Sequence, residues 1–206
     1  MTKSKPSKQK LLTATLELVG TEGLSGVTFR AVASKADLPL GLTSYYFKNK
    51  DEMLTEAYYL FHQSSMVPVN EFIESISQFF SEDNAAANTL NLGKDVLVER
   101  LTVFTTNYIK TQVVKNALDR KIAAAFMHAG IVNPMIRELV AERQQNFIDT
   151  GSKMLMALGV SEPKLVSSMF LSLTNHVEKQ LMLENRKRFN QKYVEQVFNH
   201  FFNLIL

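Results

Sequence analysis

The sequence predicts an all-α protein, with a short N-terminal group of three helices followed by a longer helical domain. Apolar residues recur at intervals of three and four along much of the 206-residue chain, which is the spacing of an amphipathic helix. The alternation typical of half-buried strands is weak beyond residue 64. Hydrophobic residues make up 46% of the chain, so these periodic segments can bury a core when they pack together.

Three short helices are expected in the first fifty residues, at Ser7–Thr21, Phe29–Ala36 and Leu40–Phe47. Ser7 is a suitable N-cap for the first helix, and Gly23 is a suitable stop. Pro39 is tolerated as the first residue of the third helix but not inside the second. The chain must therefore break between the second and third helices.

The longer part of the chain is predicted to be helical throughout. Asn49 can cap a fourth helix, and later breaks fall at Pro68, at Asn133-Pro134 and at Gly159. Further helices are expected near residues 69–80, 94–113, 115–129, 134–157, 162–184 and 190–205.

The positive charge is concentrated at the N-terminal end. Residues 1–50 hold eight Lys and Arg against three acidic residues, a net charge of +5, whereas residues 51–206 hold fifteen against seventeen, a net charge of -2. A basic module on a near-neutral body is typical of binding to a phosphate backbone, although on charge alone a solvated surface is the simpler interpretation. We predict two domains, residues 1–50 and residues 51–206.

Two short helices separated by a three-residue break have the geometry of a helix-turn-helix, in which one helix enters the major groove of DNA. This spacing is weakly specific, but the sequence around it is more specific: Thr28-Phe29-Arg30-Ala31-Val32-Ala33, Ala36-Asp37-Leu38-Pro39-Leu40-Gly41 and Tyr45-Tyr46-Phe47-Lys48-Asn49-Lys50. From residue 7 to near residue 60 the chain resembles the TetR family of repressors.

The chain departs from the family pattern at a few positions. Asp37 stands where the family usually has a Gly in a left-handed turn, a conformation that Asp tolerates better than most residues. Pro39 and Leu40 replace the commoner Ser-Lys pair, and Ser44 replaces the first Tyr of the aromatic group. The preferred operator sequence therefore does not carry over from the family.

The resemblance implies that a set of residues in and around the second and third helices binds operator DNA: Thr28, Arg30, Leu40, Gly41, Leu42, Thr43, Ser44, Tyr45, Tyr46, Lys48 and Lys50. Chemistry agrees for several of them, because Arg30 can bind guanine through two hydrogen bonds and a leucine can contact a thymine methyl group. The small Gly41 lets the backbone approach DNA closely. For the two tyrosines, packing in the protein is an equally good interpretation.

The resemblance also implies a small-molecule effector bound among the helices of the longer domain. Aromatic residues and Met on these helices favour an apolar or aromatic effector, although most of them are expected to be core. The candidate effector-binding residues are Phe104, Tyr108, Phe126, Met127, His128, Phe147, Asn175 and His176. In the resembled family, such an effector shifts the protein toward a form that does not fit its operator.

A homodimer is expected through the helices near 162–184 and 190–205. Each carries an apolar stripe, one of Val166, Met169, Phe170, Leu173, Val177 and Leu181, the other of Val194, Val197, Phe198, Phe201, Phe202 and Ile205. Two such helices can pair with the same two of a second chain as a four-helix bundle, and two recognition helices are needed for two DNA half-sites. Part of each stripe is also expected to form the chain's own core.

Other classes of protein find less support. The sequence has no cysteine, no Gly-rich phosphate loop and no pair of histidines at metal-binding spacing, so we expect no enzyme activity, no cofactor and no metal site. No segment approaches a membrane span, so a cytoplasmic protein is expected. The remaining alternative is a helical adaptor that binds another protein without specific DNA binding.

Overall fold

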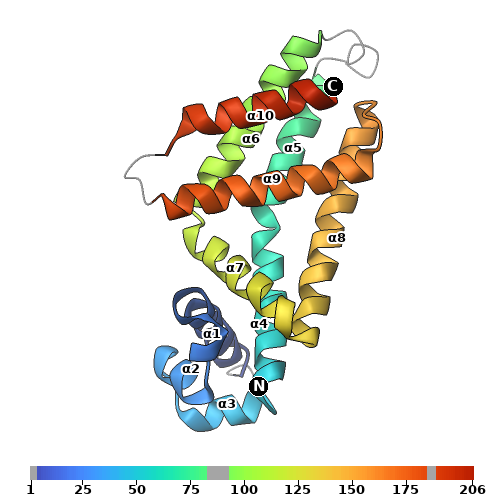
Figure 1. Cartoon of the computed structure of the whole chain (residues 1–206). Helices are drawn as coiled ribbons and strands as arrows, with labels where there is room; N and C mark the ends of the chain where they lie inside the picture. Colours follow the sequence, from blue (N-terminus) through green and yellow to red (C-terminus); the bar gives the residue numbers. More distant parts are fainter. Residues whose placement is uncertain (1–3, 83–92, 185–188) are drawn as a thin grey trace. The chain divides into compact units, whose positions relative to one another are not determined.

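The computed structural model describes residues 4–82, 93–184 and 189–206, and within these ranges the chain is helical and has no strand (Figure 1). The prediction of an all-α fold is confirmed. None of the described helices is both long and apolar enough to cross a membrane. In chain order the helices are α1 (Ser4–Gly26), α2 (Phe29–Lys35), α3 (Leu40–Tyr46), α4 (Lys50–Ser65), α5 (Val67–Glu82), α6 (Lys94–Val114), α7 (Ala117–Val132), α8 (Pro134–Ala157), α9 (Pro163–Leu183) and α10 (Gln191–Ile205).

The predicted helices agree closely with the observed ones, with differences at the ends of α1 and α3. α1 begins at Ser4, so the prediction of an N-cap at Ser7 is wrong; Pro6 is tolerated because it lies in the first turn. Regular helix does break at Gly23, where φ is 73° and ψ is 179°, a conformation that glycine adopts without strain. Pro39 precedes α3 as its cap residue instead of being its first residue.

The chain folds into two compact units, and the first consists of the chain up to Met66 together with residues 117–143. α4 and α7 both pack on α1. Gly20 of α1 faces α7 at close range, because a Cβ atom there would lie 2.6 Å from Leu118 Cδ1. The core of this unit includes Leu11, Val19, Val32, Phe47, Met53, Ala57, Phe61, Phe126 and Ile136.

This unit is larger than the predicted domain of residues 1–50. The first three helices are short, and their apolar faces are covered by α4 and α7 in addition to one another. A group of about fifty residues buries too little surface to be stable easily alone, which accounts for the added helices. That residues 1–50 act as a functional module of their own stays a prediction.

The second unit consists of residues 67–116 and 144 onward. α10 packs along α6, and α9 also contacts α6 (Figure 1). The ring of Phe170 on α9 lies with its centroid 5.7 Å from that of Phe198 and 6.0 Å from that of Phe202 on α10. The buried core of this unit is Ile76, Val98, Leu101, Ile109, Val177, Leu181, Val194, Phe198, Phe201 and Phe202.

Candidate nucleic-acid interface

The turn between α2 and α3 is set by local hydrogen bonds and one left-handed residue. The Thr28 side chain caps α2 by accepting a hydrogen bond from the Ala31 N–H, at 3.1 Å. After α2, the Leu38 N–H donates to the Ala33 carbonyl at 3.0 Å, and Asp37 adopts a φ of 53°. The expectation that Asp37 replaces a left-handed glycine is thus confirmed, and this turn redirects the chain into α3.

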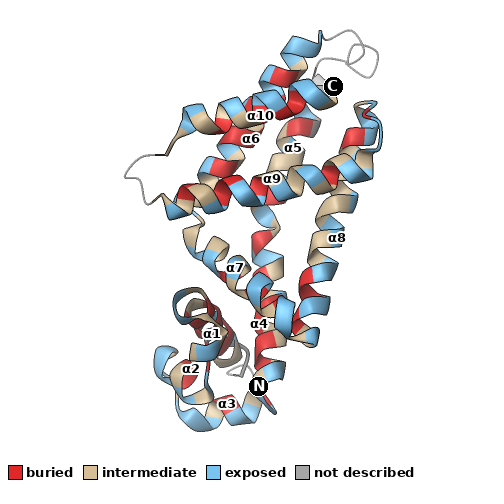
Figure 2. Ribbon diagram, viewed as in Figure 1, coloured by how far each residue is buried: buried red, intermediate tan, exposed pale blue. Residues whose placement is uncertain are grey.

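α3 has one face packed on the protein and one face exposed (Figure 2). Thr43 is completely buried and its hydroxyl donates to the Leu40 carbonyl at 2.6 Å, while Leu42 and Tyr46 pack against the core of the first unit. On the other face, Tyr45 is 74% exposed and Leu40 is 46% exposed. Gly41 and Ser44 are exposed on the same face, so α3 presents a continuous surface of four outward residues.

Gly41 has no role within the fold that requires glycine. Its φ is not positive, and a Cβ atom built on it would meet no atom within 4 Å. A glycine inside a helix is less favourable than alanine by roughly 0.5–1 kcal/mol. The absent side chain therefore leaves room for something outside the chain to approach the backbone of α3.

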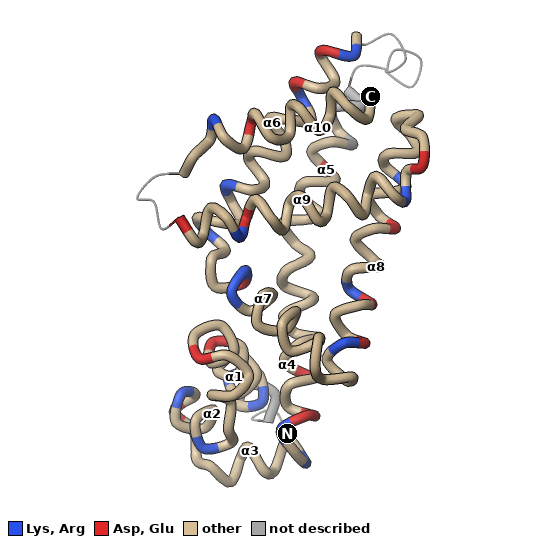
Figure 3. The backbone as a smooth tube through the Cα atoms, in the orientation of Figure 1, with Lys and Arg blue, Asp and Glu red and all other residues tan. Residues whose placement is uncertain are grey.

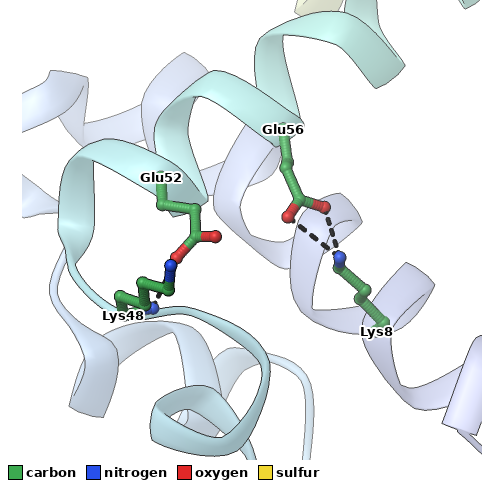
Figure 4. Close-up of polar contacts among 4 residues, drawn as sticks. All are labelled: Lys8, Lys48, Glu52 and Glu56. Atoms are coloured by element: carbon green, nitrogen blue, oxygen red, sulfur yellow. Dashed lines mark hydrogen bonds and ion pairs between the residues drawn. The ribbon is translucent and has the colours of Figure 1, made fainter.

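The N-terminus of α4 is stabilised by the side chains of Asn49 and Glu52. The Asn49 side chain accepts a hydrogen bond from the Glu52 N–H at 2.9 Å. The Glu52 carboxylate in turn accepts one from the Lys48 N–H at 2.6 Å (Figure 4). Nearby, Lys8 of α1 pairs with Glu56 of α4 at 2.6 Å, which ties the two helices together. The Lys48 residue itself is exposed beside these caps.

Besides Thr28, Leu42 and Tyr46, whose structural roles are described above, two more residues of the predicted DNA-binding set have roles inside the protein. The Lys50 ammonium donates a hydrogen bond to the Leu24 carbonyl at 2.7 Å and is half-buried, which connects the end of α1 to the start of α4. Thr43 is buried as described above. The structure therefore groups Arg30, Lys48 and the exposed face of α3 at the surface, and it holds Lys50 and Thr43 within the fold.

Basic residues lie on α2 and at the turn between α3 and α4 (Figure 3). Arg30 is exposed on α2. Lys35 at the end of α2 pairs with Glu17 of α1 at 3.1 Å, so its charge is partly compensated. Arg30 and Lys48 remain the cations best placed to bind a phosphate or a base beside α3.

The predicted effector-binding residues do not form one group. Phe126 belongs to the core of the first unit, with its ring centroid 4.9 Å from that of Tyr58, and Met127 and His128 lie exposed on α7 in that unit. Phe104, Tyr108 and Phe147 are half-buried in the second unit, whereas Asn175 and His176 are exposed on α9. The sequence analysis did not identify four buried polar residues of α6 and α9, although each lies among apolar residues of its helix: Thr105, Thr106, Gln112 and Thr174.

The apolar stripes predicted for dimerisation lie mostly inside the chain's own core. Val177, Leu181, Val194 and three phenylalanines of α10 are buried within the second unit. A different face of α9 is exposed at alternating intervals of four and three residues, and it carries Leu165, Met169, Ser172, His176, Lys179 and Leu183. Leu165 is 56%, Met169 51% and Leu183 70% exposed, so large apolar side chains do face outward from this helix.

The part of the chain that contains this interface is similar to known proteins. Residues 11–57 match the family model described as bacterial regulatory proteins, tetR family. Residues 11–57 are therefore similar to the N-terminal part of the tetR family of bacterial regulatory proteins. The resemblance noted from the helix-turn-helix motif is thus confirmed, and the matching family model describes regulatory proteins.

Individual relatives agree with this family. An uncharacterised helix-turn-helix transcriptional regulator of Xanthobacter autotrophicus is 42% identical over 52 residues, which is 25% of this chain and 26% of that protein. The chain thus spans about a quarter of the length of the curated relatives that it matches.

Solved structures share the fold over almost the whole chain. A TetR family member from Streptomyces coelicolor A3 is 16% identical, with a TM-score of 0.66 over 95% of this chain and 97% of the other. The multidrug binding protein EbrR, solved with imidazole, is 18% identical, with a TM-score of 0.61 over 94% of this chain and 93% of the other. At these identities the likeness shows a shared fold, which extends from the tetR N-terminal domain through the helices of the second unit.

Proposed function

We propose that this protein is a transcriptional regulator of the tetR family, expected to be a repressor, that inserts α3 into the major groove of operator DNA and leaves the operator when a small molecule binds. The observation that carries the proposal is the exposed face of α3, where Leu40, Gly41, Ser44 and Tyr45 point away from a helix whose opposite face is packed. An α-helix fits the major groove, and phosphate contacts from Arg30 and Lys48 would fix its position there.

The same interpretation accounts for Gly41. A base-pair edge or a sugar-phosphate chain can approach the α3 backbone closely only where no side chain intervenes. An adaptor that binds protein through another surface gives no reason for a glycine in an open position on this short helix. No observation on the structure favours the adaptor.

We further propose that two copies bind one operator. The exposed face of α9 defined by Leu165, Met169, Ser172, His176, Lys179 and Leu183 repeats at the interval typical of a helix that packs along a partner helix. Leu204 of α10, which is 73% exposed, adds a further apolar residue to the outward surface of the second unit. A symmetric dimer would give the two copies of α3 that half-sites about 34 Å apart require.

The second unit is the proposed effector-binding domain. The EbrR structures, solved with imidazole and with proflavin, are of a multidrug binding protein that shares this fold. A regulator that binds the bacterial chromosome acts in the cytoplasm, and we propose that location for this protein. Effector binding would shift the population between a form that matches the operator and a form that does not.

The proposal is tested by fluorescence anisotropy with labelled duplex DNA and two tyrosine variants of the full chain. Tyr45→Ala removes an exposed ring from α3, and we expect DNA affinity to fall by about tenfold, the effect of losing one to three kcal/mol of groove contact. Tyr59→Ala, which removes an exposed ring from α4, is the matched control and should leave affinity unchanged. Equal affinities for both variants and the wild type would contradict the proposal.

A further inference from the structure

Among the buried polar atoms of the second unit that have no hydrogen-bond partner, four belong to uncharged side chains. They are the hydroxyls of Thr105, Thr106 and Thr174 and the amide nitrogen of Gln112, and we call these four residues the polar cluster. Their exposed fractions are 0%, 3%, 6% and 1%, in that order. Buried polar groups in native proteins are almost always paired, so an unpaired set needs a physical explanation.

Other buried hydroxyls on the same helices are paired. Thr102, one turn earlier on α6, is 5% exposed and donates a hydrogen bond to the Val98 carbonyl at 2.7 Å. Ser167 on α9 donates to the Ile148 carbonyl at 2.9 Å. Unpaired hydroxyls are therefore not a general property of α6 or α9.

The polar cluster lies on helix faces that belong to one core. Thr105, Ile109 and Gln112 follow one another on α6 at intervals of four and three residues, and so share one face. On α9, Thr174 shares a face with Val177 and Leu181. Because Ile109, Val177 and Leu181 are members of one core and α6 contacts α9, the faces that carry Thr105, Gln112 and Thr174 belong to the same region of the second unit.

We infer that the polar cluster binds the hydrogen-bond acceptor of an uncharged, largely apolar effector, of the class of ketones, esters or lactones. This inference rests on the proposed function and names the effector class. The Gln112 amide nitrogen can only donate a hydrogen bond, and threonine hydroxyls can also donate, so the groups suit an acceptor oxygen. Neighbouring half-buried Phe104 and Phe170 provide apolar surface for the rest of such a molecule.

Charged ligands fit the polar cluster less well. An ammonium group could pair with the buried carboxylate of Glu178, but it has no acceptor to offer the Gln112 donor. A carboxylate would add a second acidic group to the face of α9 that already buries Glu178, which is 4% exposed. A neutral acceptor therefore satisfies the most groups without bringing an additional charge into the core.

The inference is tested with small molecules that share one phenyl group and differ in the polar group. Thermal unfolding of the full chain is followed with acetophenone, ethylbenzene, 1-phenylethylamine or benzoate at equal concentrations. We expect acetophenone to raise the unfolding midpoint most and to bind about fivefold more tightly than ethylbenzene, which is the effect of one net hydrogen bond. A larger shift with the amine or with benzoate would overturn the assignment of an uncharged ligand.

Variants separate a binding role from a packing role. Thr105→Val and Thr174→Val each remove an unpaired hydroxyl, so we expect a higher unfolding midpoint without ligand and no preference for acetophenone over ethylbenzene. Thr105→Ser keeps the hydroxyl and should keep the preference. Thr102→Val is the matched control, because its hydroxyl is already paired, and it should also keep the preference.

Two further results would overturn the inference: no shift with any of the four compounds, or a preference for acetophenone that survives both valine substitutions. These results concern ligand binding in the absence of DNA. Binding of duplex DNA by the same preparations is measured separately, so a failure of DNA binding would contradict the proposed function without affecting the assignment of the polar cluster.

Discussion

An alanine at position 41 would make α3 more stable than the glycine does. The stability of the protein and its affinity for DNA can therefore be measured separately in a variant at this position. A methyl group at this position would meet no atom of the chain. We therefore predict that Gly41→Ala raises the free energy of unfolding in urea by roughly 0.5–1 kcal/mol and weakens duplex binding, because the methyl group projects into the space proposed for DNA.

The control for Gly41→Ala is a stabilising change in a helix far from α3 in the sequence. Asn107 is exposed on α6, and Asn107→Ala should raise the free energy of unfolding by about 0.5 kcal/mol without changing DNA affinity. A Gly41→Ala protein that is more stable and binds DNA as tightly as the wild type would show that α3 does not contact DNA.

Two neighbouring lysines at the start of α4 are expected to differ in function. Lys48 is exposed, so Lys48→Ala should weaken binding to all duplexes and lower the salt slope of the affinity by about one, without loss of stability. Lys50 holds the Leu24 carbonyl, so Lys50→Ala should reduce the free energy of unfolding by roughly 1 kcal/mol. Fluorescence anisotropy at several salt concentrations measures the DNA affinity of both variants, and urea unfolding measures their stability. If Lys50→Ala lowered the salt slope and Lys48→Ala lowered the stability, Lys50 would be the phosphate contact.

His62 on α4 makes the stability of the first unit dependent on pH. Burial lowers the pKa of its imidazole from the ordinary value of 6.5, and the charge of Arg143 lowers it further. The unfolded chain therefore binds a proton near pH 6.5 that the folded chain accepts only at lower pH, so this contribution to stability is present above pH 6.5 and is lost as the pH falls below it.

We predict that His62→Gln flattens this part of the pH dependence. Urea unfolding at pH values on either side of the ordinary imidazole pKa should show a smaller loss of stability in the variant than in the wild type. An identical loss in both proteins would show that the imidazole is as easily protonated in the folded chain as in the unfolded chain.

At the scale of single elements, α4 depends on its cap. The Asn49 side chain satisfies the Glu52 N–H, which has no partner within the helix. Asn49→Ala should reduce the free energy of unfolding by about 1 kcal/mol. Asn49→Asp should retain most of the cap's stabilising effect, because aspartate is an equally good cap. Thermal or urea unfolding measures both; equal losses would show that the cap hydrogen bond does not stabilise α4.

The positions of the helices were predictable because their ends depend on local chemistry. The stop at Gly23, the left-handed turn at Asp37 and the cap at Asn49 are properties of single residues and their near neighbours. The start of α1 was less predictable, since several residues before Ser7 can extend a helix and Pro6 is tolerated in its first turn.

Which helices pack against each other was less predictable than where each helix begins and ends. The apolar spacing of α7 indicates that Phe126 is buried, but only the long-range contact with Tyr58 and Phe61 places it in the first unit. Likewise, the pattern of α9 and α10 gave two apolar stripes without showing that they pack against each other and α6. Amphipathicity identifies a buried face, whereas the identity of the covering element depends on the tertiary fold.

For the proposed DNA-binding surface, too, local features were predictable and contacts between helices were not. Exposed residues of α3 were identified by position in a motif, but the burial of Thr43 and the hydrogen bond of Lys50 depend on packing between helices. A motif gives the positions of residues along the chain. It does not show which face of a seven-residue helix is exposed for binding and which face packs on the protein.

At the scale of the whole molecule, the chain passes between its two units at residues 66–67, 116–117 and 143–144. The last passage lies within α8, so one continuous helix supplies residues to both units. If the second unit binds an effector and the first binds DNA, as proposed, these connections join the two sites along the chain. This provides the covalent route that the proposed population shift needs.

Dimerisation is predicted to depend on the exposed face of α9. Met169→Lys places a charge among the apolar residues of that face, and we expect it to weaken self-association in sedimentation velocity by tenfold or more. Val103→Lys, at a 43% exposed position of α6, is the matched control and should leave self-association unchanged. A wild-type monomer at micromolar concentration, or equal effects of both variants, would contradict a dimer through α9.

The most direct measurement of the central claim is selection of bound sequences from a library of random duplex DNA by the full chain. If α3 reads base pairs in the major groove as part of a symmetric dimer, the selected sequences should contain an inverted repeat whose half-sites are one helical turn or a multiple of it apart, and Tyr45→Ala should lose this enrichment. A library that emerges unenriched from the wild-type protein, or one enriched equally by Tyr45→Ala, would contradict the account.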